Sequence, residues 1–305
     1  MTGAAERGVS VIIATRDRPE LLRRAVDAVW SQEHDGKIDI VLVFDRSEPD
    51  LGLAKVEGDR RIVVTSNVRS PGLAGARNSG VDVSTQPWIA FCDDDDEWLT
   101  GKLAAQFRAL RAKPGARVAT TGIYIHFEGD DITRIPKPER LTYDGFLEDR
   151  MTEVHPSATL VARSVIDEIG PVDEDIPGGY AEDYDWLMRA AQVSSFAVAA
   201  QPLVRVNWHG ASFFFERWKM IDDALGYLVA KHPRFQQHPK GLARVQGQQA
   251  VARAAMGDRG GALRAARATF RLSPTERRVP VAVVCAAGVP AGFVLKTLHR
   301  FGKGI

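Results

Sequence analysis

The sequence has 305 residues, of which 45% are hydrophobic and 26% are charged, and this composition excludes a largely disordered chain. Its 40 Lys and Arg residues nearly balance its 39 Asp and Glu residues, so we expect no nucleic-acid partner. The two cysteines, Cys92 and Cys285, are too few for a disulfide framework or a cysteine-rich zinc site. Because no apolar leader precedes the first apolar run at residue 9, we expect no secretory signal and a cytoplasmic protein.

Short apolar runs alternate with helical patterns in the first third of the chain. The runs predict strands at residues 9–14, 38–44, 61–65 and 88–91, and the helical patterns lie at 21–29 and 76–83. This order is typical of a mostly parallel α/β sheet flanked by helices.

The pattern then becomes mixed. We expect a helix at 99–112, a strand at 118–127, a charged proline-containing loop at 128–140, short helices at 164–169 and 184–192, and one or two strands within 196–207. From residue 214 to 278 the pattern is helical, with an Ala/Arg-rich helix pair at 242–256 and 261–272. The sequence therefore predicts an α/β domain at 1–212 and a helical extension at 213–305.

Five consecutive acidic residues, 93–97, follow the predicted strand at 88–91. Crowded carboxylates repel one another, and some would take up protons unless a cation offset their charge. Ligands bind at the carboxyl ends of strands in open α/β sheets, and Mg²⁺ or Mn²⁺ prefers oxygen ligands. The run therefore predicts a divalent-metal site. The alternative is a solvent-exposed acidic loop at the start of the next helix.

A glycine-rich segment, residues 71–80, begins a helix just upstream of these acids. Glycines at a helix start expose backbone N–H groups to anions, and the guanidinium of Arg77 can pair with a phosphate. Together with a metal-type acidic cluster, this segment favours a nucleoside diphosphate as the ligand.

These segments resemble the family 2 glycosyltransferases of the GT-A fold. The matching pieces, in the order expected for that family, are 9–18 (VSVIIATRDR), 72–80 (GLAGARNSG), 91–98 (FCDDDDEW), 169–174 (IGPVDE) and 181–186 (AEDYDW). The resemblance covers roughly residues 8–212. It implies a GT-A catalytic domain at 1–212, with a nucleotide-sugar half at about 1–112 and an acceptor half at about 113–212.

The resemblance implies nucleotide-binding roles for residues at the strand ends. Thr15 and Asp17 would line the nucleotide pocket, and Asp45 would accept a hydrogen bond from the base. Arg77 would face the pyrophosphate. After Asp45 this sequence reads Arg-Ser-Glu where the family usually has Asp-Gly-Ser, so the ribose and base contacts of that loop stay open.

The resemblance also implies the metal ligands. Asp93 and Asp95 match the two acids of the DxD motif, with Asp93 contacting the ribose and the metal and Asp95 the metal itself. Asp96 is a further metal candidate, and the additional acid leaves the register open to Asp94. The implied metal is Mn²⁺ or Mg²⁺, and His209 would complete its shell, contact the diphosphate, or do neither.

Glu182 and Asp183 match the Glu-Asp motif that begins an inner helix in the family. Asp183 would be the base that deprotonates the acceptor hydroxyl, and Glu182 would orient the acceptor. The alternative is an acidic helix start stabilised by the helix dipole. Trp208 is a candidate platform for the acceptor sugar, and His155 is an acceptor-side or structural residue.

Near its end the chain carries an apolar segment, residues 279–295, that is slightly short for a membrane span and contains prolines. Arginine and lysine residues flank it on both sides, as in segments that bind an anionic membrane surface. The alternative is a helical hairpin that packs on the catalytic domain or mediates self-association.

The sequence thus predicts an inverting, metal-dependent transferase acting in cell-wall or polysaccharide biosynthesis, in the cytoplasm or at the inner face of the membrane. It would move a sugar from a nucleoside-diphosphate sugar, with UDP favoured, to a hydroxyl of a glycan, a lipid-linked acceptor or a natural product. The alternatives are a nucleotidyltransferase and a catalytically silent sugar-nucleotide-binding or scaffold protein.

Overall fold

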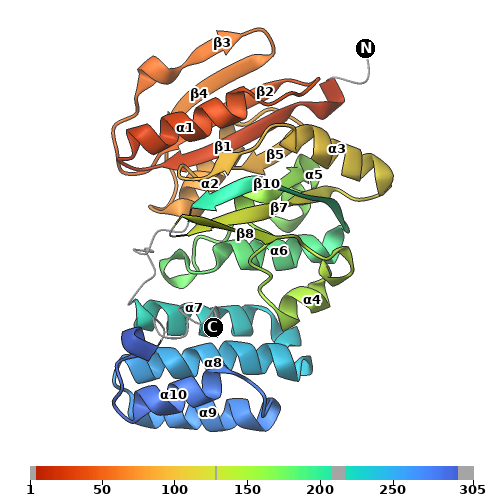
Figure 1. Ribbon diagram of the computed structural model, residues 1–305. Coiled ribbons are helices and arrows are strands. Elements are labelled where there is room, and N and C mark those ends of the chain that lie inside the picture. The colour runs from red at the N-terminus through yellow and green to blue at the C-terminus, as the bar shows by residue number, and fades with distance from the viewer. Residues whose placement is uncertain (1–4, 128, 208–216, 295–305) are drawn as a thin grey trace. The chain divides into compact units, whose positions relative to one another are not determined.

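The computed structural model describes residues 5–127, 129–207 and 217–294 (Figure 1). The chain divides into two compact units. The first comprises residues 1–143, 151–174 and 182–210, and the second comprises 144–150, 175–181 and 211–305. The second unit therefore includes two short segments of the predicted acceptor half. The division at residue 212 stays a prediction.

The first unit is built on one mixed sheet. In spatial order its described strands are β3 (Lys55–Glu57), β4 (Arg60–Ser66), β2 (Ile38–Phe44), β1 (Val9–Thr15), β5 (Trp88–Phe91), β9 (Thr159–Ala162), β7 (Val118–Phe127), β10 (Phe196–Asn207) and β6 (Glu97–Trp98), with β8 (Asp130–Arg134) paired to β7. Strands β4, β2, β1 and β5 run parallel, as do β7 and β10. Strand β9 is antiparallel to both of its neighbours. The carboxyl ends of β2, β1 and β5 consequently lie at one edge of the sheet.

Helices pack against this sheet (Figure 1), and apolar side chains of the strands and helices form the hydrophobic core between them. Helices α1 (Pro19–Trp30) and α2 (Leu73–Val83) contact β1 and β2, and α3 (Lys102–Ala112) contacts β7 and β10. Helices α5 (Arg163–Ile169) and α6 (Glu182–Val193) pack against each other. All seven residues of β2 are buried, which explains why six of them are apolar; the seventh, Asp39, is paired with Arg61 Nη2 at 2.8 Å. The predicted α/β sheet with flanking helices is confirmed.

Two predicted elements were wrong in part. The loop expected at 128–140 contains β8, whose exposed and largely polar residues gave no apolar signal. The helix expected from residue 99 begins only at Lys102, because residues 97–98 pair with β10 as β6 and Gly101 adopts a φ of +80°. Strand β10 is a single strand with register shifts around Pro202, which has no N–H group for the ladder.

The second unit is helical. It contains α7 (Trp218–Lys231), α8 (Pro239–Ala255), α9 (Arg259–Leu272) and α10 (Arg278–Ala286), and α4 (Tyr143–Glu148) falls almost wholly within one of its short segments. The predicted Ala/Arg-rich helix pair is α8 and α9. Gly257 ends α8 with a φ of +83°, and the Asp258 carboxylate caps α9 by accepting from the Gly261 N–H at 2.8 Å.

Helix α10 covers part of the apolar segment at 279–295. Its buried residues Val281, Ala282, Cys285 and Ala286 pack against small residues of α8 and α9. Pro280 lies in its first turn, where a missing N–H group breaks no helical hydrogen bond. Within the described ranges, every helix is too short or too polar to cross a lipid bilayer.

Candidate active site

Three predicted nucleotide-site residues lie at one edge of the sheet, because Thr15, Asp45 and Asp93 lie at or just after the carboxyl ends of β1, β2 and β5. Thr15 ends β1, Asp45 follows β2, and the Asp45 N–H donates to the Thr15 carbonyl at 2.9 Å. The Asp45 carboxylate is buried and accepts from Asn67 Nδ2 at 2.8 Å and from the Gly72 N–H at 3.1 Å. Asp45 therefore ties the loop that begins α2 to the end of β2. Asp17 is exposed, and its φ of +53° places it in a tight turn after β1.

The central acids of the 93–96 run point toward β1 and its following turn. Asp94 accepts from Thr15 Oγ1 at 2.8 Å and from Arg18 Nη1 at 3.1 Å. Burial raises the pKa of Asp94, although Thr15 and Arg18 act in the opposite direction. Asp95 is also bound by Arg18, through a 3.1 Å contact to Oδ2.

Asp96 points inward and is nearly inaccessible to solvent. Ser157 Oγ donates to its carboxylate at 2.6 Å and accepts from the Asp93 N–H at 3.0 Å, so one hydroxyl orders both ends of the acidic turn. His155 Nδ1 lies 3.4 Å from Asp96 Oδ2. Burial and repulsion from Asp93 raise the pKa of Asp96 well above its usual range. A buried carboxylate of this kind stays ionised when a cation binds beside it.

Asp93, Asp96 and His155 form a group whose candidate ligand atoms all lie within 4.8 Å of one another. Burial lowers the pKa of His155, which favours the neutral imidazole that binds metals. Two oxygen ligands and one nitrogen ligand suit a transition-metal cation such as Mn²⁺. The group thus contains two of the predicted metal residues and one predicted acceptor-side residue, whereas Asp95 contacts Arg18.

Arg77 connects the end of β5 to the start of α6. Its buried guanidinium donates to Asp93 Oδ1 at 2.7 Å and to Glu182 Oε1 at 3.0 Å, and it lies 5.5 Å from the centroid of the Phe91 ring. Although burial disfavours the charged form, Asp93 and Glu182 hold the pKa of Arg77 above its usual value. The predicted pyrophosphate contact of Arg77 stays a prediction, as does the acceptor-orienting role of Glu182.

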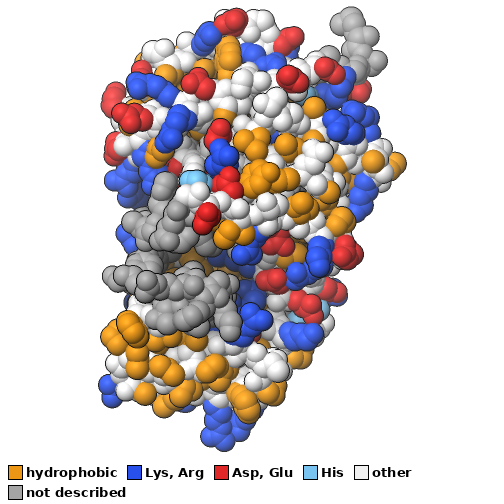
Figure 2. Space-filling view, in the orientation of Figure 1, with side chains coloured by type: hydrophobic (Ala, Val, Ile, Leu, Met, Phe, Trp, Pro, Cys, Tyr) orange, Lys and Arg blue, Asp and Glu red, His pale blue; other side chains and the backbone are white. Residues whose placement is uncertain are grey.

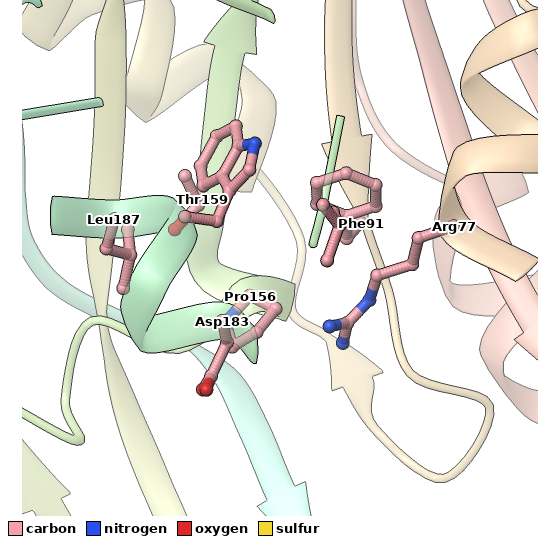
Figure 3. Close-up of a pocket in the computed structure, with 8 residues that line it drawn as sticks. Arg77, Phe91, Pro156, Thr159, Asp183 and Leu187 are labelled. Atoms are coloured by element: carbon pink, nitrogen blue, oxygen red, sulfur yellow. The ribbon is translucent and has the colours of Figure 1, made fainter. Parts of the chain in front are cut away.

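A small, mostly apolar cavity lies beside this ion-pair network (Figure 3). Its lining is Arg77, Phe91, Pro156, Thr159, Val172, Asp183, Trp186 and Leu187. Asp183 from α6 and Arg77 from α2 line it from different elements (Figure 3). Among these lining residues, Asp183 carries the sole carboxylate. Its Oδ1 accepts from the Tyr184 N–H at 2.8 Å, so the first turn of α6 helps to orient it.

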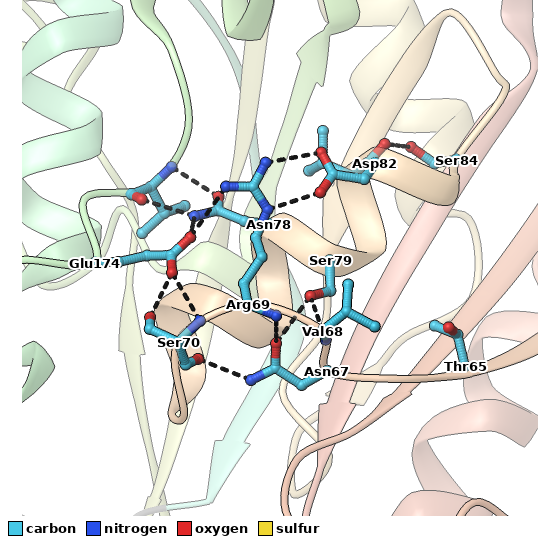
Figure 4. Close-up of polar contacts among 12 residues, drawn as sticks. Thr65, Asn67, Val68, Arg69, Ser70, Asn78, Ser79, Asp82, Ser84 and Glu174 are labelled. Carbon is cyan, nitrogen blue, oxygen red and sulfur yellow. Dashed lines mark hydrogen bonds and ion pairs between the residues drawn. The ribbon is translucent and has the colours of Figure 1, made fainter.

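A second polar network fixes the loop that begins α2 (Figure 4). Glu174 accepts from the Ser70 N–H at 3.0 Å, from Arg69 Nη1 at 3.2 Å and from Asn78 Nδ2 at 2.7 Å. Asn78 also pairs with both backbone groups of Val172. These hydrogen bonds hold the pKa of Glu174 below its usual value, although its partial burial acts against them.

Sequence reasoning did not find Glu174, Ser157 or Arg18. Glu174 and Arg18 lie within segments that match the family, but sequence gives no indication of their side-chain partners. Ser157 lies two residues from His155 in an unremarkable segment. Trp208 and His209, predicted for the acceptor and metal sites, lie outside the described residues.

The mixed sheet and the acidic turn after β5 are the features that the sequence predicted for a glycosyltransferase. The sequence model described as glycosyl transferase family 2 matches residues 10–170, which is more than half of the chain. The chain belongs to this family. This membership confirms the predicted class of enzyme and the expected family.

Named relatives agree with this class. An uncharacterized glycosyltransferase of Methanocaldococcus jannaschii is 24% identical over 240 residues, covering 75% of this chain and 81% of its own. The amylovoran biosynthesis glycosyltransferase AmsB of Erwinia amylovora is 28% identical, with 73% and 77% covered. A UDP-Glc:α-D-GlcNAc-diphosphoundecaprenol β-1,3-glucosyltransferase of Escherichia coli, WfaP, is 32% identical over 34% of this chain, and the match spans under half of that protein, 42%.

Two solved structures share the GT-A fold with this chain. The structure of S. aureus TarS residues 1–349 in complex with UDP-GlcNAc has a TM-score of 0.61 at 13% identity, covering 97% of this chain and 92% of that one. A mannosyltransferase of Pyrobaculum calidifontis in complex with GDP-Man and Mn²⁺ has a TM-score of 0.55 at 16% identity, covering 99% and 81%. These likenesses confirm the predicted fold.

Proposed function

We propose that this glycosyltransferase moves a sugar from a nucleoside-diphosphate sugar to an acceptor hydroxyl with inversion at the anomeric carbon. The observation that carries the proposal is that Asp183 is the one acidic residue among those lining the cavity beside the Arg77–Asp93 pair. A single base facing the acceptor suits one direct displacement, because no second carboxylate among the lining residues is placed to form a covalent intermediate.

The proposed donor is a UDP-sugar. Support comes from the two solved structures of the same fold, which hold UDP-GlcNAc and GDP-Man, and from the UDP-Glc named for the Escherichia coli relative. Thr15 and Asp45 lie at the strand ends where a nucleotide binds in open α/β sheets. Asp45 would accept from the base, and Asp17 would line the same pocket.

A divalent cation, Mn²⁺ or Mg²⁺, is the proposed cofactor, with Asp93, Asp96 and His155 as the residues that would hold it. When bound, such a cation neutralises the charge that develops on the departing diphosphate. Ser157 keeps the Asp96 carboxylate oriented, and Arg77 keeps Asp93 oriented. Asp95 stays a further candidate ligand on the strength of the family motif.

In the proposed reaction, the Asp183 carboxylate accepts the proton of the acceptor hydroxyl. The hydroxyl oxygen forms a bond to the anomeric carbon, and the bond from that carbon to the diphosphate oxygen breaks. The nucleoside diphosphate leaves with the electron pair of that bond. Arg77 contributes positive charge on the donor side of the cavity, where negative charge develops.

The proposed acceptor is a lipid-linked glycan in polysaccharide biosynthesis. The names of two relatives support this class, since one acts in amylovoran biosynthesis and the other on a diphosphoundecaprenol-linked sugar. Trp208 would stack on the acceptor sugar, and His209 would contact the metal or diphosphate.

The test is turnover with UDP-Glc, UDP-GlcNAc, GDP-Man and dTDP-Glc, each with and without Mn²⁺, in the presence of an undecaprenyl-diphosphate-linked GlcNAc acceptor. We expect one UDP-sugar to be consumed only with the cation, with release of UDP and a β-linked product by NMR. An α-linked product would contradict inversion, and release of pyrophosphate would support nucleotidyl transfer instead.

A further inference from the structure

Helices α9 and α10 leave an arginine-rich and apolar surface exposed. From residue 259 to the end, the sequence contains nine Lys and Arg residues and a single acid, Glu276. Glu276 is paired with Arg278 Nη1 at 2.7 Å. The region therefore carries a large positive charge inside a chain whose net charge is only +1.

On α9, charge and apolar side chains share the outward face. Ala262, Ala266 and Thr269 are buried, whereas Leu263 and Phe270 are 48% and 52% exposed. Arg267 lies four residues after Leu263, so helical spacing places it on the same side as these two residues. The exposed arginines Arg264, Arg267 and Arg271 form no ion pair with any residue in the described part of the chain.

On α10, the outward face is wholly apolar. Its inward face packs on α8 and α9, while Pro280, Val283 and Val284 are exposed, as is Ala287 just after the helix. Over α9 and α10, the face shown in Figure 2 carries hydrophobic and Lys or Arg side chains and no Asp or Glu side chain. Valines at 43% exposure with no polar neighbour on the same helix face are unusual on a surface that meets only water.

We propose that this surface binds an anionic lipid bilayer, with α9 and α10 lying along the membrane surface. It is defined by Leu263, Arg264, Arg267, Phe270, Arg271, Val283 and Val284. Arginines without acidic partners attract anionic headgroups, and apolar side chains next to them insert at the boundary with the acyl chains. A second copy of this chain fits less well, because the same arginines would face one another with no acids to pair with. The surface lies entirely in the second unit, so the proposal does not depend on the donor, metal or base.

Sedimentation of the full chain with lipid vesicles tests the proposal. We expect binding to vesicles of phosphatidylglycerol and phosphatidylethanolamine, weaker binding as NaCl is raised, and no binding to phosphatidylcholine vesicles. The variant R264E/R267E/R271E tests the electrostatic attraction to the headgroups, and V283D/V284D tests the insertion of apolar side chains. Each is expected to weaken vesicle binding by at least about tenfold, with an unchanged unfolding midpoint as evidence of folding.

A matched control makes the same charge change elsewhere. R23E/R24E/R111E replaces three exposed arginines of the first unit, and it is expected to keep vesicle binding within about twofold if the site is local. Equal binding by the control and by R264E/R267E/R271E would overturn the proposal, as would equal binding to phosphatidylcholine. A dimer in light scattering that V283D/V284D converts to monomer would also overturn it, in favour of contact between copies.

Discussion

The Arg77 guanidinium and the Glu182 carboxylate form a buried ion pair at 3.0 Å, and the same guanidinium holds Asp93 at 2.7 Å. One side chain thus links the acidic turn after β5 to the first turn of α6, which carries Asp183. Because the one guanidinium binds both carboxylates, it fixes the position of Asp93, a proposed metal ligand, relative to the helix turn that carries Asp183, the proposed base.

Removal of Arg77 is expected to take from the buried Glu182 carboxylate its 3.0 Å ion pair, so that the negative charge is less well compensated. We expect Arg77→Met to lower the free energy of unfolding by about 3–5 kcal/mol, measured by urea denaturation. The double variant R77M/E182Q removes that charge, so it should be more stable than R77M alone. A double variant as unstable as the sum of the two single variants would contradict this coupling.

The metal ligands implied by the sequence and the group found in the structure share Asp93 and Asp96. They differ in Asp95, which only the sequence implies, and in the histidine, which is His209 in the first set and His155 in the second. Calorimetry with Mn²⁺ tests the contributions of Asp95 and His155. We expect Asp96→Asn and His155→Ala each to weaken Mn²⁺ binding by about tenfold or more. Asp95→Asn removes a partner of Arg18 and should weaken Mn²⁺ binding by less than about threefold. A larger loss for Asp95→Asn than for the other two variants would favour the family motif as read from sequence.

Lys102 is a fully buried amine whose charge is not used at the site. Burial lowers the pKa of Lys102 to about 7, and its Nζ donates to Gln106 at 3.1 Å beside the Trp98 ring. In the unfolded chain its pKa is near the ordinary value, so the folded state is destabilised below pH 7 and recovers as the pH rises from 7 to about 10.

Lys102→Met should therefore raise the free energy of unfolding at pH 7 by a few kcal/mol, on the order of the pKa difference. The gain should shrink as the pH approaches 10, and urea denaturation at pH 7, 8.5 and 10 measures it. Lys37→Met, at an exposed position, is the control and should leave stability unchanged. Loss of stability in Lys102→Met at pH 7 would show that the charged amine is stabilising.

Glu174 is expected to stabilise the loop before α2 through its ionised form. Glu174→Gln should cost about 1–2 kcal/mol at pH 7, because Arg69 and Ser70 lose a charged acceptor. The folded pKa of Glu174 is below its unfolded value, so this stabilisation is present at neutral pH and is lost as the pH falls through the folded pKa. Glu139→Gln, at an exposed site, is the matched control. A loss that persisted unchanged at low pH would contradict an electrostatic cause.

The centre of the parallel sheet could be predicted because β1, β2 and β5 are buried over most of their length and their sequences are mostly apolar. Strand β8 could not, because its exposed residues carry no such pattern, and β9 has only four residues. For the site, sequence predicts which acids follow β5 but not where each one points. The direction of each side chain depends on hydrogen-bond partners far along the chain: Ser157 donates to the buried Asp96, whereas Arg18 donates to Asp95.

The central claim is that Asp183 is the base of a nucleotide-sugar transferase, and the most direct measurement compares turnover and UDP affinity in wild type and Asp183→Asn. We expect release of UDP to fall by about 10²–10⁴-fold, while UDP binding by calorimetry with Mn²⁺ changes by less than about threefold. Turnover close to that of wild type in Asp183→Asn would contradict the account.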